Sequence, residues 1–287
     1  MSRLTVQHFY DEPTGTLTYV VHDDATKIGA VIDSLTDYDP KSARTTLGAC
    51  ERVRRYVDDR GLRIPYVLDT HAHADRLTGI PFFEQGYGAA SVIGWKITEV
   101  QATFRRIFNL GDDFPVDGSQ FGLLLHDGET LRVGPITIEG LYTPGHTPAC
   151  MTYRIEDMLF VGDVLFMPDF GVARCDFPGG SAEALYDSVM RLHALPDETR
   201  VFTGHDYRVG GRPLRFESTI GEQKRSNVLL NATTKKEDFV ALRKRRDAGL
   251  DMPVLILPAV QINIRAGRLP QPEPNGVSYL KIPVNAL

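Results

Sequence analysis

Four times along this sequence, an apolar run with the composition of a β-strand is followed by histidine or aspartate. The first case is DTHAHADRL (residues 69–77), which comes directly after the short apolar run Ile64–Leu68. The other three are TPGHTP (143–148), GD (162–163) and GHDY (204–207). In α/β proteins the functional groups usually lie where the strands end. The pattern therefore predicts an α/β fold in which polar side chains at the strand exits carry the chemistry.

The rest of the chain alternates β-rich and helical patterns. Residues Thr16–His22 and Ile28–Ser34 predict the two strands of a hairpin. Apolar residues spaced by three or four from Ala43 to Val57 predict an amphipathic helix, with Gly61 at its C-terminal cap. Further predicted strands are Leu131–Leu141 (with a turn at Gly134–Pro135), Met158–Val161 and Val201–Thr203, and further predicted helices are Ser181–Leu195, Glu217–Leu230 and Lys236–Asp247.

The C-terminal part lacks a strand exit of this kind. Its segment Leu257–Gly267 predicts a strand that either packs on the core or completes a dimer contact, so a homodimer is one expectation. No low-complexity segment or long linker divides the chain. We therefore expect a single domain over residues 1–287, with a core over about 1–207 and a C-terminal extension over about 208–287.

Composition excludes several classes of protein. Hydrophobic residues make up 42% of the 287 residues and charged residues 24%, as expected for a buried core. The net charge of −5 argues against a nucleic-acid surface. The three cysteines lie far apart and form no C-x-x-C pair, which argues against a disulfide framework or a zinc ribbon. No signal-peptide pattern or apolar run of about 20 residues is present, so we expect a cytoplasmic protein that does not enter membranes.

The residue types at the strand exits are those that bind metal ions through imidazole nitrogen or carboxylate oxygen. His71 and His73 are two positions apart, and side chains at that spacing point the same way in an extended chain. Glycine precedes His146, Asp163 and His205 and allows the backbone to turn sharply there. Any one of these histidines alone is more often an ordinary loop residue. Together, and in this order after β-runs, they predict a metal site.

The ordered set H-x-H-x-D, TPGHT, VGD and GHDY resembles the metallo-β-lactamase superfamily, over residues of about Thr16 to Tyr207. The resemblance implies an α/β fold, namely an αβ/βα four-layer sandwich of two mixed β-sheets with helices outside and the metal at one edge. Many members of the superfamily hold two metal ions that share the Gly-Asp carboxylate. The fold expected here is therefore the metallo-β-lactamase fold followed by a C-terminal extension.

Arg76 departs from the two-metal pattern, because two-metal members have histidine at this position. A guanidinium stays protonated and has no lone pair for a metal. A dication about 5 Å away would be repelled by about 7 kcal/mol at an effective dielectric near 20. We therefore expect one metal ion, with Arg76 paired to Asp75 or Asp163. The alternative is that Arg76 points away to solvent.

The stretches GVARCDFPGG (171–180), GHDY and ESTIGEQKR (217–225) are similar to the persulfide dioxygenase branch, whose fold is like that of glyoxalase II. The resemblance implies a mononuclear non-haem Fe(II) dioxygenase that uses O2 to oxidise a low-molecular-weight thiol persulfide, such as glutathione persulfide, to sulfite and thiol. It implies metal ligands at His71, His146 and Asp163. It also implies surrounding groups that do not bind the ion, which are His73, Asp75 and His205. Arg76, which replaces the usual histidine of the branch, is expected to lie among these groups.

Two residues are expected to act on the substrate. Arg174 corresponds to an arginine near the substrate pocket and would pair with a carboxylate of the thiol. Tyr207 corresponds to a tyrosine that lines the pocket and would donate a hydrogen bond to a sulfur or oxygen intermediate. The alternatives are a structural salt bridge for Arg174 and a packed aromatic ring for Tyr207. Cys175 is either a reactive thiol beside Arg174 or a buried, inert one.

The segment Asn227–Leu230 departs from the Asn-Pro-Arg-Leu of the branch. Leu229 stands where an arginine of the branch helps to bind glutathione. Either Arg212 or Arg215 compensates for the missing cation, or the carrier thiol is not glutathione. Two other functions are also considered: a zinc-dependent, glyoxalase II-like hydrolase of a thioester or ester, and a metal-binding relative without catalytic activity. Zinc is therefore the alternative to Fe(II).

Overall fold

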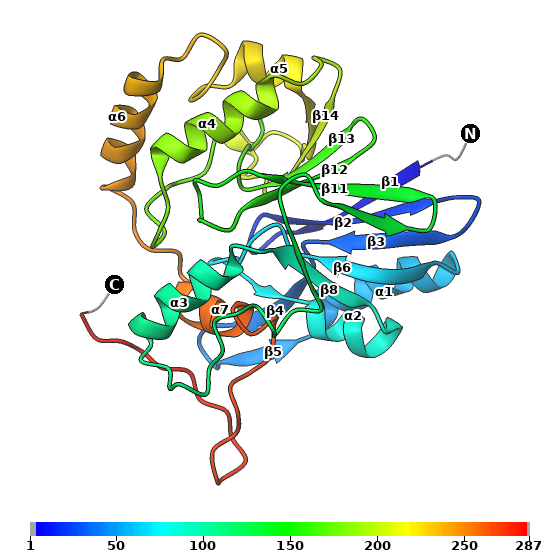
Figure 1. The fold of residues 1–287 in the computed structure, drawn as a ribbon, viewed down its shortest axis with the longest axis vertical. Coiled ribbons are helices and arrows are strands. Elements are labelled where there is room, and N and C mark those ends of the chain that lie inside the picture. Colours follow the sequence, from blue (N-terminus) through cyan, green and yellow to red (C-terminus); the bar gives the residue numbers. More distant parts are fainter. Residues whose placement is uncertain (1–3, 286–287) are drawn as a thin grey trace.

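The computed structural model describes residues 4–285, and it contains two six-stranded β-sheets that lie face to face (Figure 1). The first sheet has the order β1 (Leu4–Asp11), β2 (Thr16–Asp23), β3 (Ile28–Ile32), β6 (Arg63–Leu68), β8 (Ala90–Gly94) and β9 (Leu123–Leu125). The second has the order β10 (Thr130–Val133), β11 (Ile136–Tyr142), β12 (Met151–Ile155), β13 (Met158–Gly162), β14 (Arg200–Thr203) and β15 (Glu217–Thr219). A small third sheet has the order β5 (Arg44–Thr46), β4 (Leu35–Asp39) and β7 (Leu77–Thr78).

Both large sheets are mixed. In the first sheet β3, β6, β8 and β9 run parallel, while β1, β2 and β3 are antiparallel neighbours. In the second sheet only β13 and β14 are parallel. The space between the sheets is filled by apolar side chains from both, among them Tyr19 on β2 with Phe160 and Phe202 on β13 and β14. The other face of the first sheet is covered by helices, so β2 is buried along its whole length.

Helices cover the outer face of each sheet (Figure 1). On the first sheet these are α1 (Gly48–Asp59), α2 (Ile80–Tyr87), α3 (Ile97–Ile107) and α7 (Ile256–Asn263). On the second they are α4 (Ala182–His193), α5 (Ile220–Ser226) and α6 (Lys236–Asp247). A 3-10 turn, η1 (Val209–Gly211), follows β14. The order helix, sheet, sheet, helix is the four-layer αβ/βα sandwich, so the expected fold class is confirmed.

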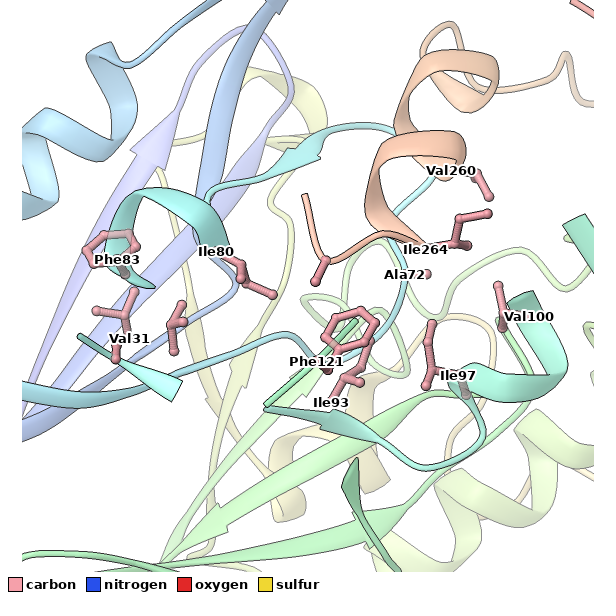
Figure 2. Packing of buried hydrophobic residues seen from close by; sticks show 14 of the residues in the cluster. Val31, Ala72, Ile80, Phe83, Ile93, Ile97, Val100, Phe121, Val260 and Ile264 are labelled. Atoms are coloured by element: carbon pink, nitrogen blue, oxygen red, sulfur yellow. The ribbon is translucent and has the colours of Figure 1, made fainter. Parts of the chain in front are cut away.

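The C-terminal segment is helical, and the strand predicted over Leu257–Gly267 is wrong. It forms α7 because Ile256, Val260 and Ile264 recur every four residues, which places them on one face of a helix. That face packs into the core beneath the first sheet, beside Ile97 and Val100 (Figure 2). The extension therefore contributes to the same hydrophobic core as the first sheet.

Two predicted helix boundaries are also wrong. Ala43 lies in the turn between β4 and β5 with φ of +53°, and α1 begins only at Gly48. The helix predicted over Glu217–Leu230 begins as strand β15, and α5 ends at Ser226. Its start is fixed by Thr219, whose hydroxyl accepts the backbone N–H of Glu222. The hairpin, the turn at Gly134–Pro135, α4, α6, β6, β13 and β14 are confirmed within one or two residues. Among residues 4–285, no helix is long and apolar enough to cross a membrane.

Candidate metal centre

Three side chains from separate strand exits converge at one edge of the two sheets. His71 follows β6, His146 lies between β11 and β12, and Asp163 follows β13. Their ligand atoms all lie within 4.8 Å of one another, and all three residues are buried. Asp163 Oδ2 is 3.8 Å from His71 Nε2 and 3.8 Å from His146 Nε2. The structure thus brings together the three residues that the sequence suggested as metal ligands.

The loop that carries His71 is held in place by the residue beside it. Ala72 is 1% exposed and belongs to the same hydrophobic cluster as Val260 and Ile264 of α7 (Figure 2). Because the methyl group of Ala72 points into the core, the imidazoles of His71 and His73 lie on the other side of the loop, at the site. Their ring centres are 4.0 Å apart. The alternation expected for His71 and His73 is therefore realised by packing of the residue between them.

Two glycines let the other ligands reach the site. Gly162 precedes Asp163 and has φ of +52°, and a Cβ there would lie 2.3 Å from Thr70 Oγ1. Gly145 precedes His146 and has φ of +143°, and a Cβ there would lie 2.4 Å from the backbone of Leu185 in α4. At both positions a side chain would push the ligand-bearing segment away from its neighbour.

The hydrogen bonds of the two histidines leave one nitrogen of each ring free for a metal. His146 Nδ1 donates to the carbonyl of Arg174 at 2.8 Å. His71 Nδ1 donates to Thr70 Oγ1 at 3.0 Å, and the Thr70 hydroxyl in turn donates to Asp33 at 2.9 Å. His71 Nε2 is buried and has no hydrogen-bond partner among residues 4–285. Burial also lowers the pKa of His71, which keeps the ring neutral, as a metal ligand must be.

Asp163 completes a ligand set of two imidazoles and one carboxylate. Burial alone would raise its pKa, but the hydrogen bond from His205 and the nearby His71 and His146 hold the pKa well below its ordinary value. His205 Nδ1 donates to Asp163 Oδ1 at 2.8 Å, which leaves Oδ2 turned toward the two histidines. An unpartnered buried nitrogen and an oriented carboxylate fit a divalent transition-metal ion with open positions.

Arg76 is buried, and its partners differ from those expected. Its side chain is 1% exposed, which excludes the alternative that it points to solvent. Its Nη2 lies 2.8 Å from His73 Nε2 and 3.6 Å from Asp33 Oδ2. The expected pairing with Asp75 or Asp163 is therefore wrong. Those two carboxylates are turned instead toward His205.

A second group of possible metal ligands consists of Asp33, Asp69 and His73. Arg76 already uses the lone pair of His73 Nε2, and it brings a positive charge to this group. Burial, followed by the charge of Asp33, raises the pKa of Asp69 to about 8. A protonated Asp69, a cation and an engaged imidazole make a poor site for a second ion.

Asp33 is a residue of the site that the sequence reasoning missed. It follows β3 with φ of +56° and accepts hydrogen bonds from the backbone and the hydroxyl of Thr70. Burial would raise its pKa, but His73 and Arg76 hold it at about 2. An aspartate at the end of the apolar run of β3 is the same signal as at the other strand exits, and it could have been found.

His205 is clamped between two carboxylates. Its Nε2 donates to Asp75 Oδ2 at 2.6 Å while its Nδ1 donates to Asp163. Burial would lower the pKa of His205, but Asp163 and Asp75 raise it to about 10. With both nitrogens donating, the ring has no lone pair for a metal. Tyr207 stacks on this ring, with centroids 5.5 Å apart, and is 46% exposed.

Asn263 of α7 is a second residue that the sequence reasoning missed. It supports the ligand loop, which is the segment after β6 that carries His71 and His73. Its amide nitrogen donates to the carbonyls of His73 and Arg76, at 2.8 Å each, and its oxygen accepts the N–H of Thr78 at 2.9 Å. The side chain is 2% exposed. No local pattern around residue 263 indicated this contact, because its partners are about 190 residues away in the sequence.

A cavity of about 190 Å³ adjoins the site, and His146 and Asp163 are among the residues that line it. Tyr207 and Arg174 both line it, as expected, but Arg174 is not free. Its Nε and Nη2 donate to the two carboxylate oxygens of Asp176, at 2.6 and 2.5 Å, and its Nη1 donates to the carbonyl of Asp251 at 2.7 Å. These contacts are those of the alternative considered for Arg174, a structural salt bridge.

The residues proposed to replace the missing arginine lie elsewhere. Arg212 is held by Asp169 and Asp206, and Arg215 pairs with Glu222. Neither belongs to the lining of the cavity, whereas Leu229 does. Cys175 is 8% exposed, and burial raises the pKa of its thiol, as in a buried and inert cysteine.

Comparison with known proteins gives a consistent picture of the family. A family model described as "Metallo-beta-lactamase superfamily" matches residues 11–205. A "Probable metallo-hydrolase" of Burkholderia pseudomallei is 47% identical over 99% of this chain and 100% of its own length. "Glyoxylase B2" of Dictyostelium discoideum is 41% identical over 100% of this chain and 99% of its own. "Beta-lactamase hydrolase-like" proteins of Xylella fastidiosa and Agrobacterium fabrum are longer, and the chain spans 65% of their length.

More distant relatives carry a different description. The mitochondrial "Persulfide dioxygenase ETHE1" of Homo sapiens is 28% identical over 92% of this chain and 89% of its own. Among solved structures, "ETHE1 from Myxococcus xanthus" is 30% identical and superposes with a TM-score of 0.74, covering 92% of this chain and 100% of that one.

Proposed function

Because this chain belongs to the metallo-beta-lactamase superfamily, we propose that it uses the superfamily's metal site as a mononuclear non-haem iron(II) dioxygenase that oxidises the persulfide of a low-molecular-weight thiol. The observation that carries the proposal is the buried guanidinium of Arg76, 2.8 Å from His73 Nε2. It engages His73 in the second group of possible ligands and leaves His71, His146 and Asp163 for one ion. Two histidines and one carboxylate form the ligand set of many iron(II) oxygenases.

The reaction consumes a persulfide, O2 and water and yields a thiol, sulfite and two protons. The outer sulfur gives up four electrons, which O2 takes, and the third oxygen of sulfite comes from water. Iron(II) bound by His71, His146 and Asp163 would have open coordination positions for the sulfur of the persulfide and for O2.

The chain itself supplies orientation and exclusion of water. His205 holds one oxygen of Asp163, so the other stays turned toward the two histidines. Phe166 and Phe170 pack on Tyr207 and form an apolar wall of the cavity. The Tyr207 ring lines the same cavity, from which its hydroxyl would donate a hydrogen bond to a substrate sulfur or oxygen.

Oxygen uptake tests this function. The protein is loaded with iron under nitrogen, and O2 consumption is then followed with an oxygen electrode. We expect uptake only after glutathione persulfide is added, with one sulfite formed for each O2 consumed. Absence of uptake with glutathione persulfide and with other small persulfides would rule the proposal out.

A zinc-dependent hydrolase is the second candidate. In its favour, the relatives described as a metallo-hydrolase and as glyoxylase B2 are 47% and 41% identical, against 28% for the human persulfide dioxygenase. A single zinc ion would lower the pKa of a bound water for attack on a thioester. Elemental analysis and turnover of a glutathione thioester distinguish the two: tightly held zinc with thioester cleavage favours the hydrolase.

A further inference from the structure

An anionic thiol bound in this cavity would need a cation, and Arg174 could provide one only by giving up its existing contacts. Its guanidinium donates to both oxygens of Asp176 and to the carbonyl of Asp251. Leu229 is 8% exposed and lies against Gly171, where a Cβ would be 2.5 Å from Leu229 Cγ. The wall formed by Leu229 is therefore apolar.

Helix α6 supplies two other arginines to this cavity. Arg243 and Arg246 are three positions apart, on the same side of the helix, and both line the cavity. Arg243 is 4% exposed, pairs with Asp247 at 2.5 Å, and has a buried Nε without a partner among residues 4–285. Arg246 is exposed, and its side chain has no hydrogen bond or ion pair within the described part of the chain.

Helix α6, which carries these arginines, is attached to another segment of the cavity wall. Asp247 Oδ2 accepts the backbone N–H of Cys175 at 2.9 Å, which ties α6 to the segment that carries Arg174. At about 190 Å³, the cavity is smaller than the roughly 300 Å³ at which pockets begin to enclose a drug-sized ligand. A thiol as large as a tripeptide would extend past the enclosed part to the mouth, where Arg246 and Leu250 are exposed.

We propose that Arg246, backed by Arg243, binds a carboxylate of the carrier thiol, so that the substrates are persulfides of carboxylate-bearing thiols. This inference rests on the proposed function and adds a recognition site on α6. Arg246 supplies donors that no described residue engages, and Arg243, although its charge is paired with Asp247, has a buried Nε that no described residue engages.

The test compares Arg246→Gln with Arg245→Gln, its matched control. Arg245 is the adjacent arginine of α6, is also exposed, and does not line the cavity. Iron-loaded proteins are assayed with glutathione persulfide and with the uncharged 2-hydroxyethyl persulfide. We expect Arg246→Gln to raise KM for glutathione persulfide by about three- to tenfold with kcat unchanged. KM for 2-hydroxyethyl persulfide should not change, and Arg246→Lys should restore most of the loss.

The two proposals can fail separately. Equal KM values in Arg246→Gln and Arg245→Gln would overturn the carboxylate site and leave the dioxygenase function intact. If the unmodified protein oxidises no persulfide, the function fails, and calorimetry with glutathione and its diethyl ester under nitrogen then tests the site. Weaker glutathione binding by Arg246→Gln than by Arg245→Gln, with the ester unaffected, would support the site, and equal binding would overturn it.

Discussion

At the scale of single residues, the proposal of one metal ion depends on Arg76. The guanidinium of Arg76 donates to His73 and lies 3.6 Å from the carboxylate of Asp33. The positive charge of Arg76 therefore compensates the buried carboxylate of Asp33. Asp33 does not need a metal ion for this compensation. Since Arg76 has no lone pair, the substitution of histidine by arginine removes a ligand and adds repulsion at the same time.

Replacing Arg76 by histidine should reverse this effect. Arg76→His removes the cation, frees His73 Nε2 and adds an imidazole, so the metal content should rise from one ion toward two per chain. Elemental analysis of the protein after metal loading measures it. Arg76→Met, which removes the charge without adding a ligand, is the control and should stay at one. A stoichiometry of one in Arg76→His would show that another feature limits the number.

A histidine away from the site should make stability depend on pH. His193, at the end of α4, is 7% exposed, and neither ring nitrogen has a hydrogen-bond partner among the described residues. Burial, followed by the charge of Lys224, lowers its pKa to about 4. The unfolded chain takes up this proton below a pH of about 6.5 and the folded protein does not. The folded protein therefore has its full free energy of unfolding above a pH of about 6.5. Part of this free energy is lost as the pH falls from about 6.5 toward about 4.

Urea unfolding of the metal-free protein at pH 7.5 and pH 4.5 measures this contribution. The unmodified protein should lose about 2 kcal/mol more than His193→Leu between the two pH values. His126→Leu, at an exposed position, is the control and should behave like the unmodified protein. An equal loss in all three proteins would mean that His193 does not contribute.

At the scale of elements, α7 is the support of the ligand loop. Val260 and Ile264 pack in one cluster with Ala72 (Figure 2). Asn263 donates hydrogen bonds to the backbone carbonyls of His73 and Arg76. A helix from the last part of the chain therefore sets the position of a loop that follows β6. The neighbouring site elements are positioned differently, by glycines before Asp163 and His146.

Substitution of Asn263 separates support of the site from general stability. Asn263→Ala removes three buried hydrogen bonds and should lower the free energy of unfolding by about 2–4 kcal/mol. It should also weaken metal binding at least tenfold. Gln261→Ala is the matched control, because Gln261 is equally buried on α7 but bonds to Lys281 in the tail. Metal titration should distinguish the two variants, and equal affinities would contradict a supporting role for α7.

At the scale of the whole molecule, the sequence predicted those features that depend on neighbouring residues. Histidines and aspartates at strand exits are local signals, so the residues of the candidate centre could be named, and their order indicated the fold. The contacts of Arg76 with Asp33 and of Asn263 with the ligand loop join residues far apart in the chain, and no local pattern encodes them. The four-residue period of Ile256, Val260 and Ile264 is a local signal for the helix α7, which the strand prediction over Leu257–Gly267 does not use.

Diffraction from crystals of the iron-loaded protein, collected at the iron absorption edge, tests the central claim most directly. One anomalous peak per chain is expected, within bonding distance of His71 Nε2, His146 Nε2 and Asp163 Oδ2. A second peak beside Asp33 and His73, a second peak that shares Asp163, or a single peak away from the first three residues would contradict it.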